Sequence, residues 1–182
     1  MFYCIILSVC FCTLTSTPRI STGPRVGVAS YKIKSARQTW LESNNIFKDV
    51  LNTDIDNHAD THCFGKNFRP LNWSDLMCSV SPFLSEYTTT YNVEICMAAT
   101  AWKNHTGQVY ILLFGQGLWF GDRMDRSRIN PNQCRSYGIS PCNDPTYPHR
   151  LLGFQTNTLN TPLFMEGKIE TMYTRCPSLE EI

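Results

Sequence analysis

The sequence lacks any marked excess of one charge. Its 182 residues contain 16 Lys and Arg against 15 Asp and Glu, which gives a net charge of +1, and charged residues make up only 17% of the chain. Nucleic-acid-binding domains usually carry a strongly basic surface, so no nucleic-acid partner is predicted. Hydrophobic residues make up 42% of the chain, which is enough to bury a core, and the length suits one compact domain.

The sequence also lacks paired cysteines, because none of its nine cysteines belongs to a Cys-x-x-Cys motif and the number is odd. A structural zinc site needs four ligands at close spacing, and the nearest approach is Cys134, Cys142 and His149 in a proline-rich loop. We therefore expect reduced thiols that pack as small hydrophobic side chains, and we predict no metal and no cofactor. The nine are Cys4, Cys10, Cys12, Cys63, Cys78, Cys96, Cys134, Cys142 and Cys176.

A hydrophobic run long enough to span a bilayer comfortably is absent as well. Residues 2–14 are apolar but short, so no membrane partner is predicted. The run has the length of a signal peptide, yet no Lys or Arg precedes it and no clean cleavage motif follows. We predict a cytoplasmic protein, with secretion as the alternative if the run is a signal. Residues 1–25 are expected to be an apolar leader and Ser/Thr/Pro linker outside the fold, and residues 26–182 the domain.

The patterns that are present predict a mainly β chain. Residues 92–102 and 109–114 are expected to pair as a hairpin, because turn-forming residues lie between them. Residues 130–138 begin with Asn and Pro and end with Gly, which is typical of one short helix. Further strands are predicted at residues 26–34, 45–51, 118–120, 151–154, 160–165 and 168–174, with a turn at residues 166–167.

The densest group of reactive side chains lies at residues 54–62, where three carboxylates and two imidazoles fall within nine residues. The simplest interpretation is a solvated loop. Metal binding by His58, Asp60 and His62 is a second possibility, since imidazole and carboxylate groups are common metal ligands. Aspartic catalysis is a third and a Ser or Cys nucleophile a fourth, and composition alone leaves the four open.

A resemblance adds to this pattern. The run Asp56-Asn57-His58-Ala59-Asp60-Thr61 resembles the active-site turn of retropepsins, and is closest to the Asp-x-His-Ala-Asp-Thr variant of copia-type retrotransposon Gag-Pol polyproteins. Residues 63–68, which include a Cys and a Gly, continue the similarity. The match covers roughly residues 45–182 in order, and further similar blocks are residues 78–83, 95–102, 129–138 and 173–178.

The resemblance implies a single retropepsin-like closed β-barrel lobe with one short helix. Asp56 would be the catalytic carboxylate and Asp60 an outer, structural one, while Asn57, His58, Ala59 and Thr61 complete the active-site turn. Each lobe supplies one catalytic Asp, so a second copy of the chain would complete the site as a homodimer. The two carboxylates would share one proton, and the polypeptide substrate would be the polyprotein itself.

Three features depart from the common retropepsin pattern. Asn57 stands where a Ser or Thr hydroxyl normally bonds the neighbouring lobe, and His58 stands where a Gly lets backbone and substrate approach closely. Before the helix, residues 128–131 replace the hydrophobic-Gly stretch of cellular retropepsins. The alternative hypothesis is therefore a catalytically inactive retroelement fragment, which fits a chain that ends at Ile182 with no integrase or reverse transcriptase sequence after it.

Overall fold

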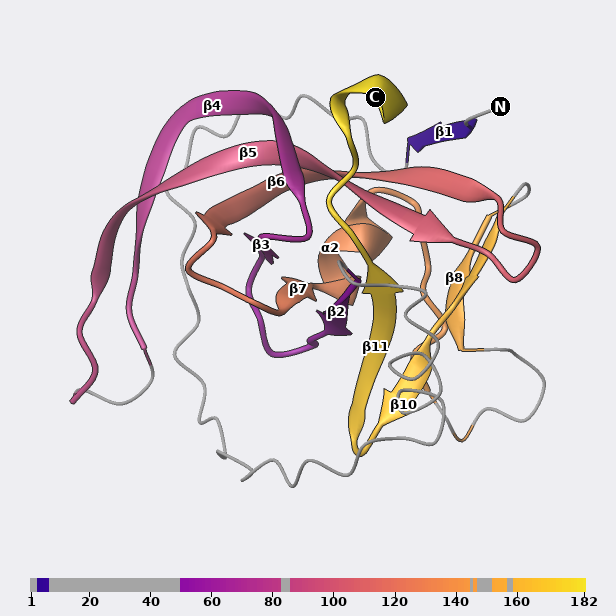
Figure 1. The fold of residues 1–182 in the computed structure, drawn as a ribbon. Helices are drawn as coiled ribbons and strands as arrows, with labels where there is room; N and C mark the ends of the chain where they lie inside the picture. The colour runs from indigo at the N-terminus through magenta and orange to yellow at the C-terminus, as the bar shows by residue number, and fades with distance from the viewer. Residues whose placement is uncertain (1–2, 7–49, 83–85, 145, 147–151, 157–158) are drawn as a thin grey trace.

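A computed structural model describes residues 3–6, 50–82, 86–144, 146, 152–156 and 159–182, and the chain is mainly β (Figure 1). The predicted strand at residues 26–34, the boundary at residue 25 and most of the predicted strand at residues 45–51 lie outside the described residues. The elements are β1 (Tyr3–Ile6), β2 (Leu51–Ile55), β3 (His62–Gly65), β4 (Arg69–Val80), β5 (Thr90–Lys103), β6 (Val109–Gly121), β7 (Ser127–Ile129), α2 (Pro131–Ser136), β8 (Gly153–Gln155), β9 (Asn160–Pro162), β10 (Phe164–Glu166), β11 (Ile169–Thr174) and the 3-10 helix η1 (Leu179–Glu181).

One large sheet contains most of the strands, in the order β10-β11-β2-β7-β3-β6-β5-β4. Neighbours that are close in sequence, such as β5 and β6, pair antiparallel, whereas β2 pairs parallel with β7 and β3 pairs parallel with β6. The parallel pairing of β2 with β7 places Asp56, the residue that follows β2, beside the end of β7, where the chain leads into α2. β1, which lies within residues 1–25, pairs parallel with β6.

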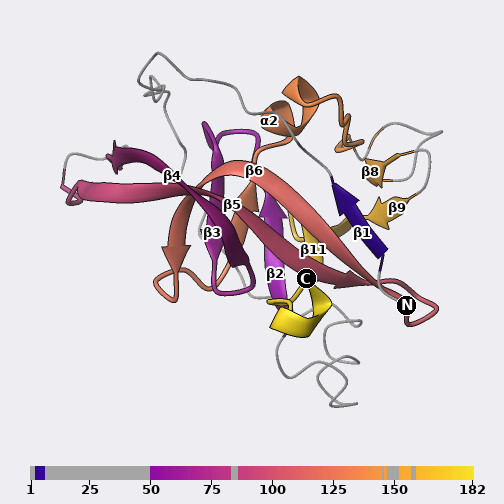
Figure 2. The same cartoon turned by 90° about the horizontal axis from the view of Figure 1, so that it is seen from above.

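The sheet does not close into the expected β-barrel. Within the described residues it ends at β10 on one side and at β4 on the other. An isolated antiparallel bridge between Ala101 and Arg175 joins β5 to the chain just after β11, with N–H to O distances of 2.9 and 3.0 Å. The sheet therefore curls toward closure at this point, but β4 and β5 diverge from the other strands as a hairpin whose far end extends outward (Figure 2).

The core is organised by the alternation of side chains along β5 and β6. Leu112 and Phe114 face the main core, whereas Ile111 and Leu113 face a second, smaller cluster on the other side. Burial on both faces explains the unbroken apolar run of β6 in the sequence. The main cluster consists of Ile55, Phe64, Phe68, Cys96, Ala98, Trp102, Leu112, Phe114, Ile129, Cys134, Phe154, Leu159, Leu163 and Met172.

Two of the local predictions are confirmed. The hairpin expected from residues 92–102 and 109–114 is formed by β5 and β6, and the glycines at 115 and 117 lie inside a continuous β6. The helix α2 has Asn130 as N-cap and Pro131 in its first turn, and Gly138 just beyond it has a positive φ of 80°. Gly117 is required by packing, because a Cβ there would lie 2.3 Å from the Phe64 ring.

The strand predictions near the C-terminus also match the structure, with smaller changes. The predicted strand at 160–165 is divided into β9 and β10, and β10 pairs with β11 through a turn at Gly167, whose φ is 67°. β8 covers residues 153 and 154 of the strand predicted at 151–154, and it pairs with β9 in a separate two-stranded sheet. β3 and the long β4 were not predicted.

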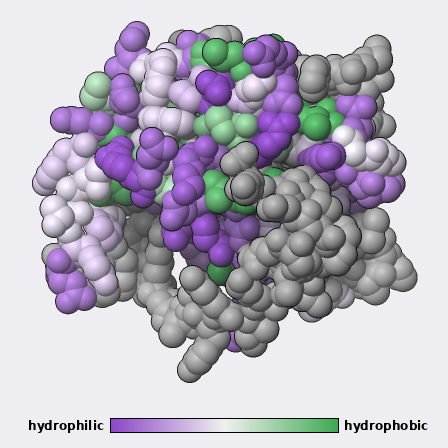
Figure 3. All heavy atoms as spheres, viewed as in Figure 1, coloured by the Kyte–Doolittle hydropathy of each residue, from purple (hydrophilic) through white to green (hydrophobic). Residues whose placement is uncertain are grey.

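The surface mixes polar and apolar residues. On the face seen in Figure 3, hydrophobic residues form separate small patches among hydrophilic ones. β4 is an edge strand with the exposed side chains Trp73, Leu76 and Met77. In the part of the chain that the structure describes, no helix is both long and apolar enough to cross a membrane.

Candidate active site at the Asp56 turn

Residues 56–61, called here the Asp56 turn, connect β2 to β3. β2 ends at Ile55, which lies beside Ile129 of β7 in parallel register. The backbone N–H of Asp56 then donates to the Ile129 carbonyl at 3.0 Å. β2 ends before Asp56, so the carboxylates of Asp54 and Asp56 do not lie together on one face of a strand. The turn begins at the position where β7 leads into α2.

The carboxylate of Asp56 is partly exposed, with 23% of its side chain accessible to solvent. Its Oδ1 accepts the His58 backbone N–H at 2.9 Å, which is typical of an Asx turn. Its Oδ2 lies 3.7 Å from Nη1 of Arg128 on β7. The carboxylate is thus oriented by its own turn, and one oxygen faces a cation.

Three side chains of the turn lie at the protein surface. Asn57, His58 and Asp60 are exposed, and the Asn57 side-chain oxygen accepts a hydrogen bond from Nδ2 of Asn143 at 3.1 Å. Of the first five residues of the turn, all of them predicted site residues, Asp56 is partly exposed, three are exposed and Ala59 is buried. Only the turn's last residue, Thr61, points to helix α2.

The underside of the turn is held by the beginning of α2. Asn130 uses its side-chain oxygen to cap the helix, accepting from the N–H of Asn132 at 2.7 Å and of Gln133 at 3.1 Å. Its Nδ2 donates to the carbonyl of Ala59. Gln133 accepts from the Thr61 hydroxyl at 3.0 Å and from the His62 N–H at 2.9 Å. One capping residue and one helix residue therefore fix the turn against the sheet.

His62 is a core residue and not a member of the accessible site. Its side chain is 1% exposed and lies against Phe64 and Phe114, with ring centroids 5.9 and 5.5 Å away. Its Nδ1 accepts the N–H of Asn130 at 3.0 Å, and burial lowers the pKa of His62 to about 3. His62 is thus neutral near pH 7 and points away from exposed His58 and Asp60.

Metal binding finds no support in this geometry. Among the described residues, no group of three or more His, Cys, Asp or Glu side chains is arranged to hold a metal ion. Two of the described cysteines, Cys96 and Cys134, are buried, and burial raises the pKa of both to about 12. His149, the third residue of the possible zinc set, lies outside the described residues.

Asp54 belongs to a separate ion-pair cluster. It is 8% exposed and accepts a bidentate pair of hydrogen bonds from Arg126, at 2.9 and 2.8 Å. Arg126 also donates to Glu166 at 2.6 Å, and Asn52 donates to the same Glu166 oxygen at 2.7 Å. This cluster ties β2 to β10 and to the residue before β7. Asp54 is therefore structural.

A buried polar layer, formed by Thr53, Asn67, Ser127 and Thr174, lies within the sheet and was missed by sequence reasoning. Each of its side chains is 0 or 1% exposed. Nδ2 of Asn67 donates to the Thr53 and Thr174 hydroxyls at 2.7 and 2.8 Å, and the Ser127 hydroxyl donates to Oδ1 of Asn67. Ser127 in turn accepts the Gly65 N–H at 2.8 Å. Nothing in the local sequence distinguishes Asn67 from an exposed Asn.

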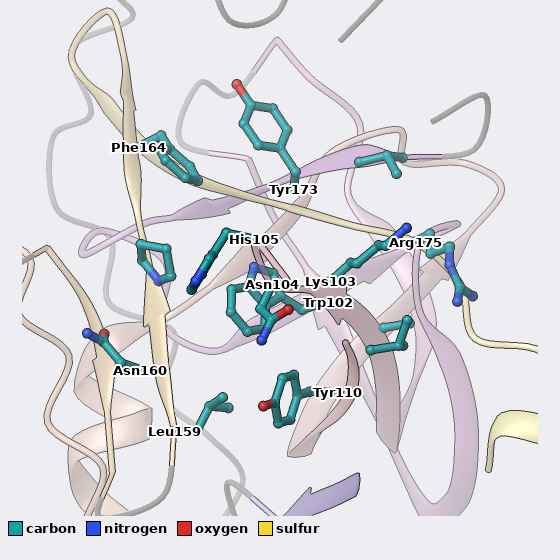
Figure 4. A pocket seen from close by; sticks show the side chains of 14 residues that line it. Trp102, Lys103, Asn104, His105, Tyr110, Leu159, Asn160, Phe164, Tyr173 and Arg175 are labelled. Carbon is teal, nitrogen blue, oxygen red and sulfur yellow. The ribbon is translucent and has the colours of Figure 1, made fainter. Parts of the chain in front are cut away.

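A cavity formed by described residues lies elsewhere (Figure 4). It has a volume of about 450 Å³, and its wall includes Trp102 and Tyr110 from the β5–β6 hairpin and Phe164 and Tyr173 from β10 and β11. No residue of the Asp56 turn lines it. The exposed side chains of the turn thus lie at the surface and outside this cavity.

Comparisons with known proteins do not identify the chain: no family model, no curated protein and no solved structure matches it.

Proposed function

We propose that the chain is the protease region of a copia-type retrotransposon polyprotein, a retropepsin-like aspartic peptidase lobe that hydrolyses peptide bonds as a homodimer. The observation that carries the proposal is the position of Asp56. Its partly exposed carboxylate stands directly after β2, in a turn whose backbone is bonded to β7 and to the start of α2. Together with the motif in residues 56–61 and the similar blocks downstream, this geometry supports a catalytic carboxylate.

The proposed chemistry needs two such carboxylates. Two carboxyl groups within hydrogen-bond distance cannot both ionise, so they share one proton. The ionised one takes a proton from water as the oxygen attacks the substrate carbonyl, and the protonated one hydrogen-bonds that carbonyl. When the C–N bond breaks, the amine leaves with a proton and the new carboxyl group keeps the water oxygen.

A second copy of the chain is the source we propose for the second carboxylate. Within the same chain, Asp54 is nearest in sequence, but it is buried and held by Nε and Nη2 of Arg126. Two-fold symmetry places the same surface of each copy opposite itself, which would bring two Asp56 turns together. The open position of the turn is compatible with such an approach.

The alternative is a retroelement fragment without enzymatic activity. Its support comes from the departures at the turn, since exposed His58 adds bulk where a Gly is usual.

Peptide cleavage by the full chain, measured from acidic to neutral pH, tests the proposal. Asp56→Asn is expected to reduce the cleavage rate by at least about 100-fold, the usual contribution of an acid–base group. Asp60→Asn is the matched control, because it removes the same charge from the same turn at an exposed position. At low protein concentration, activity should rise with the square of concentration, since two copies form one site.

Three results would count against this proposal. Folded protein that cleaves no peptide at any pH supports the inactive fragment. Cleavage that persists in Asp56→Asn shows that the activity belongs to another site or to a contaminant. Activity proportional to the first power of concentration, over a range in which the chain is monomeric, contradicts the homodimer.

A further inference from the structure

Arg128 is the one exposed residue of the three in β7. It is the central residue of β7, between Ser127 and Ile129, both of which are 0% exposed. Side chains alternate along a strand, so Arg128 projects to the other face, where 49% of its side chain is exposed. β7 has β2 on one side and β3 on the other, which fixes the backbone from which Arg128 projects.

Arg128 differs from its neighbour Arg126 in how its charge is used. Arg126 holds two carboxylates, Asp54 and Glu166, through hydrogen bonds of 2.6 to 2.9 Å. Arg128 approaches Asp56 at 3.7 Å, which is longer than a charge-assisted hydrogen bond. A half-exposed pair with this spacing contributes little stability. Exchanging Asp56 for another carboxylate should therefore cost little.

An arginine is suited to this exchange. Its planar guanidinium presents N–H donors in a fork that matches both oxygens of a carboxylate. A substrate held for attack beside Asp56 must pass close to Arg128, because the two side chains are in contact. A substrate carboxylate could bind Arg128 in bidentate fashion, at distances that Asp56 itself does not reach.

We infer that Arg128 is a specificity-determining residue that binds an Asp or Glu side chain of the substrate next to the scissile bond. This inference rests on the proposed peptidase function and names its substrate class. In a two-fold dimer an Arg128 lies on each side of the scissile bond, so acidic residues on either side are favoured.

The test is competitive cleavage of a peptide mixture by the full chain. The peptides carry Asp, Leu or Lys at the positions flanking otherwise identical scissile bonds, and relative kcat/KM values are obtained from the products. Acidic peptides should be cut about 10-fold faster than Lys peptides, the ratio expected of one charge-assisted pair. Arg128→Leu should remove this preference. Arg128→Gln serves as a second, polar variant if Arg128→Leu does not fold.

Arg123→Leu is the matched control, because it also removes one exposed arginine. Arg123 lies over the Phe120 ring, 5.6 Å from its centroid, outside the Asp56 turn. The preference should be unchanged in this variant. Asp56-dependent cleavage without acidic preference, or with a preference that survives loss of Arg128, overturns the inference and leaves the peptidase function standing. Absence of Asp56-dependent cleavage of every peptide overturns both.

Discussion

Two polar regions of this chain involve β2, one through Thr53 within the strand and the other through the turn that follows its end, and they use similar residue types in opposite ways. The buried polar layer at Asn67 has nearly every donor and acceptor paired inside the sheet. The Asp56 turn carries its Asn, His and Asp side chains at the surface. Polar groups that are already paired in the interior stabilise the fold, whereas those left accessible can act on another molecule. Residue type alone does not separate the two roles.

The comparison can be tested with residue pairs of the same type, one member from the interior and one from near the turn. The largest expected difference is in the free energy of unfolding lost when Asn67 or Asn57 is replaced by Ala. Asn67→Ala removes the partner of three buried hydroxyls, Thr53, Ser127 and Thr174, and should lower the free energy of unfolding by about 3 kcal/mol. Asn57→Ala, at an exposed position, should change it by less than about 0.5 kcal/mol.

Denaturant unfolding of the full-length variants measures this difference. A loss at Asn67→Ala no larger than at Asn57→Ala would mean that water replaces the missing amide inside the sheet. The buried layer would then not be the stabilising element that its hydrogen bonds indicate.

The next largest difference in stability loss is expected between substitutions of Arg126 and of Arg128. Arg126→Met leaves Asp54, which is 8% exposed, without its bidentate partner. Because Arg126 itself is 42% exposed, we expect a loss of about 2 kcal/mol, less than for a fully buried pair. Arg128→Met, which breaks only the 3.7 Å contact with Asp56, should cost about 0.5 kcal/mol or less.

Unfolding of both variants in low and high salt separates the two pairs further. The effect of Arg126→Met should persist in high salt, since salt screens partly buried pairs weakly. Equal losses for the two variants would contradict the assignment of Arg126 to the fold and of Arg128 to the site.

The elements that could be predicted from the sequence are those fixed by residues close to one another along the chain. The helix at Pro131 is capped by the residue before it, and the β5–β6 hairpin is joined by its own turn, so both were visible within a few residues. β4 was missed because it is an edge strand with Pro70 near its start and many exposed residues, which hides the apolar alternation. An edge strand can leave most of its side chains exposed, so its sequence need not show a buried apolar face.

The site was only partly predictable for the same reason. The carboxylates and imidazoles at residues 54–62 were visible as a cluster, but the sequence could not assign Asp54 and His62 to the interior. Their roles depend on Arg126 and Asn130, which lie 72 and 68 residues away along the chain. The contact between Arg128 and Asp56 likewise depends on the parallel register of β2 and β7. No local pattern encodes such a register.

The smallest expected difference lies between His62 and His58, and it is a difference in pH dependence. Burial lowers the pKa of His62 from 6.5 to about 3 in the folded chain, so the unfolded chain binds a proton at higher pH than the folded one. Stability from this residue is therefore complete above about pH 6.5 and is lost as pH falls toward 3. At about pH 5.5 the loss relative to neutral pH should be roughly 1 kcal/mol.

Denaturant unfolding at several pH values, compared between variants, isolates this contribution from that of the carboxylates. His62→Phe should flatten the decline between about pH 6.5 and 5, even though it lowers stability overall by removing the acceptor of the Asn130 N–H. His58→Phe, which replaces an exposed imidazole of the turn by the same side chain, is the matched control. A decline that persists unchanged in His62→Phe would show that the buried imidazole is not its cause.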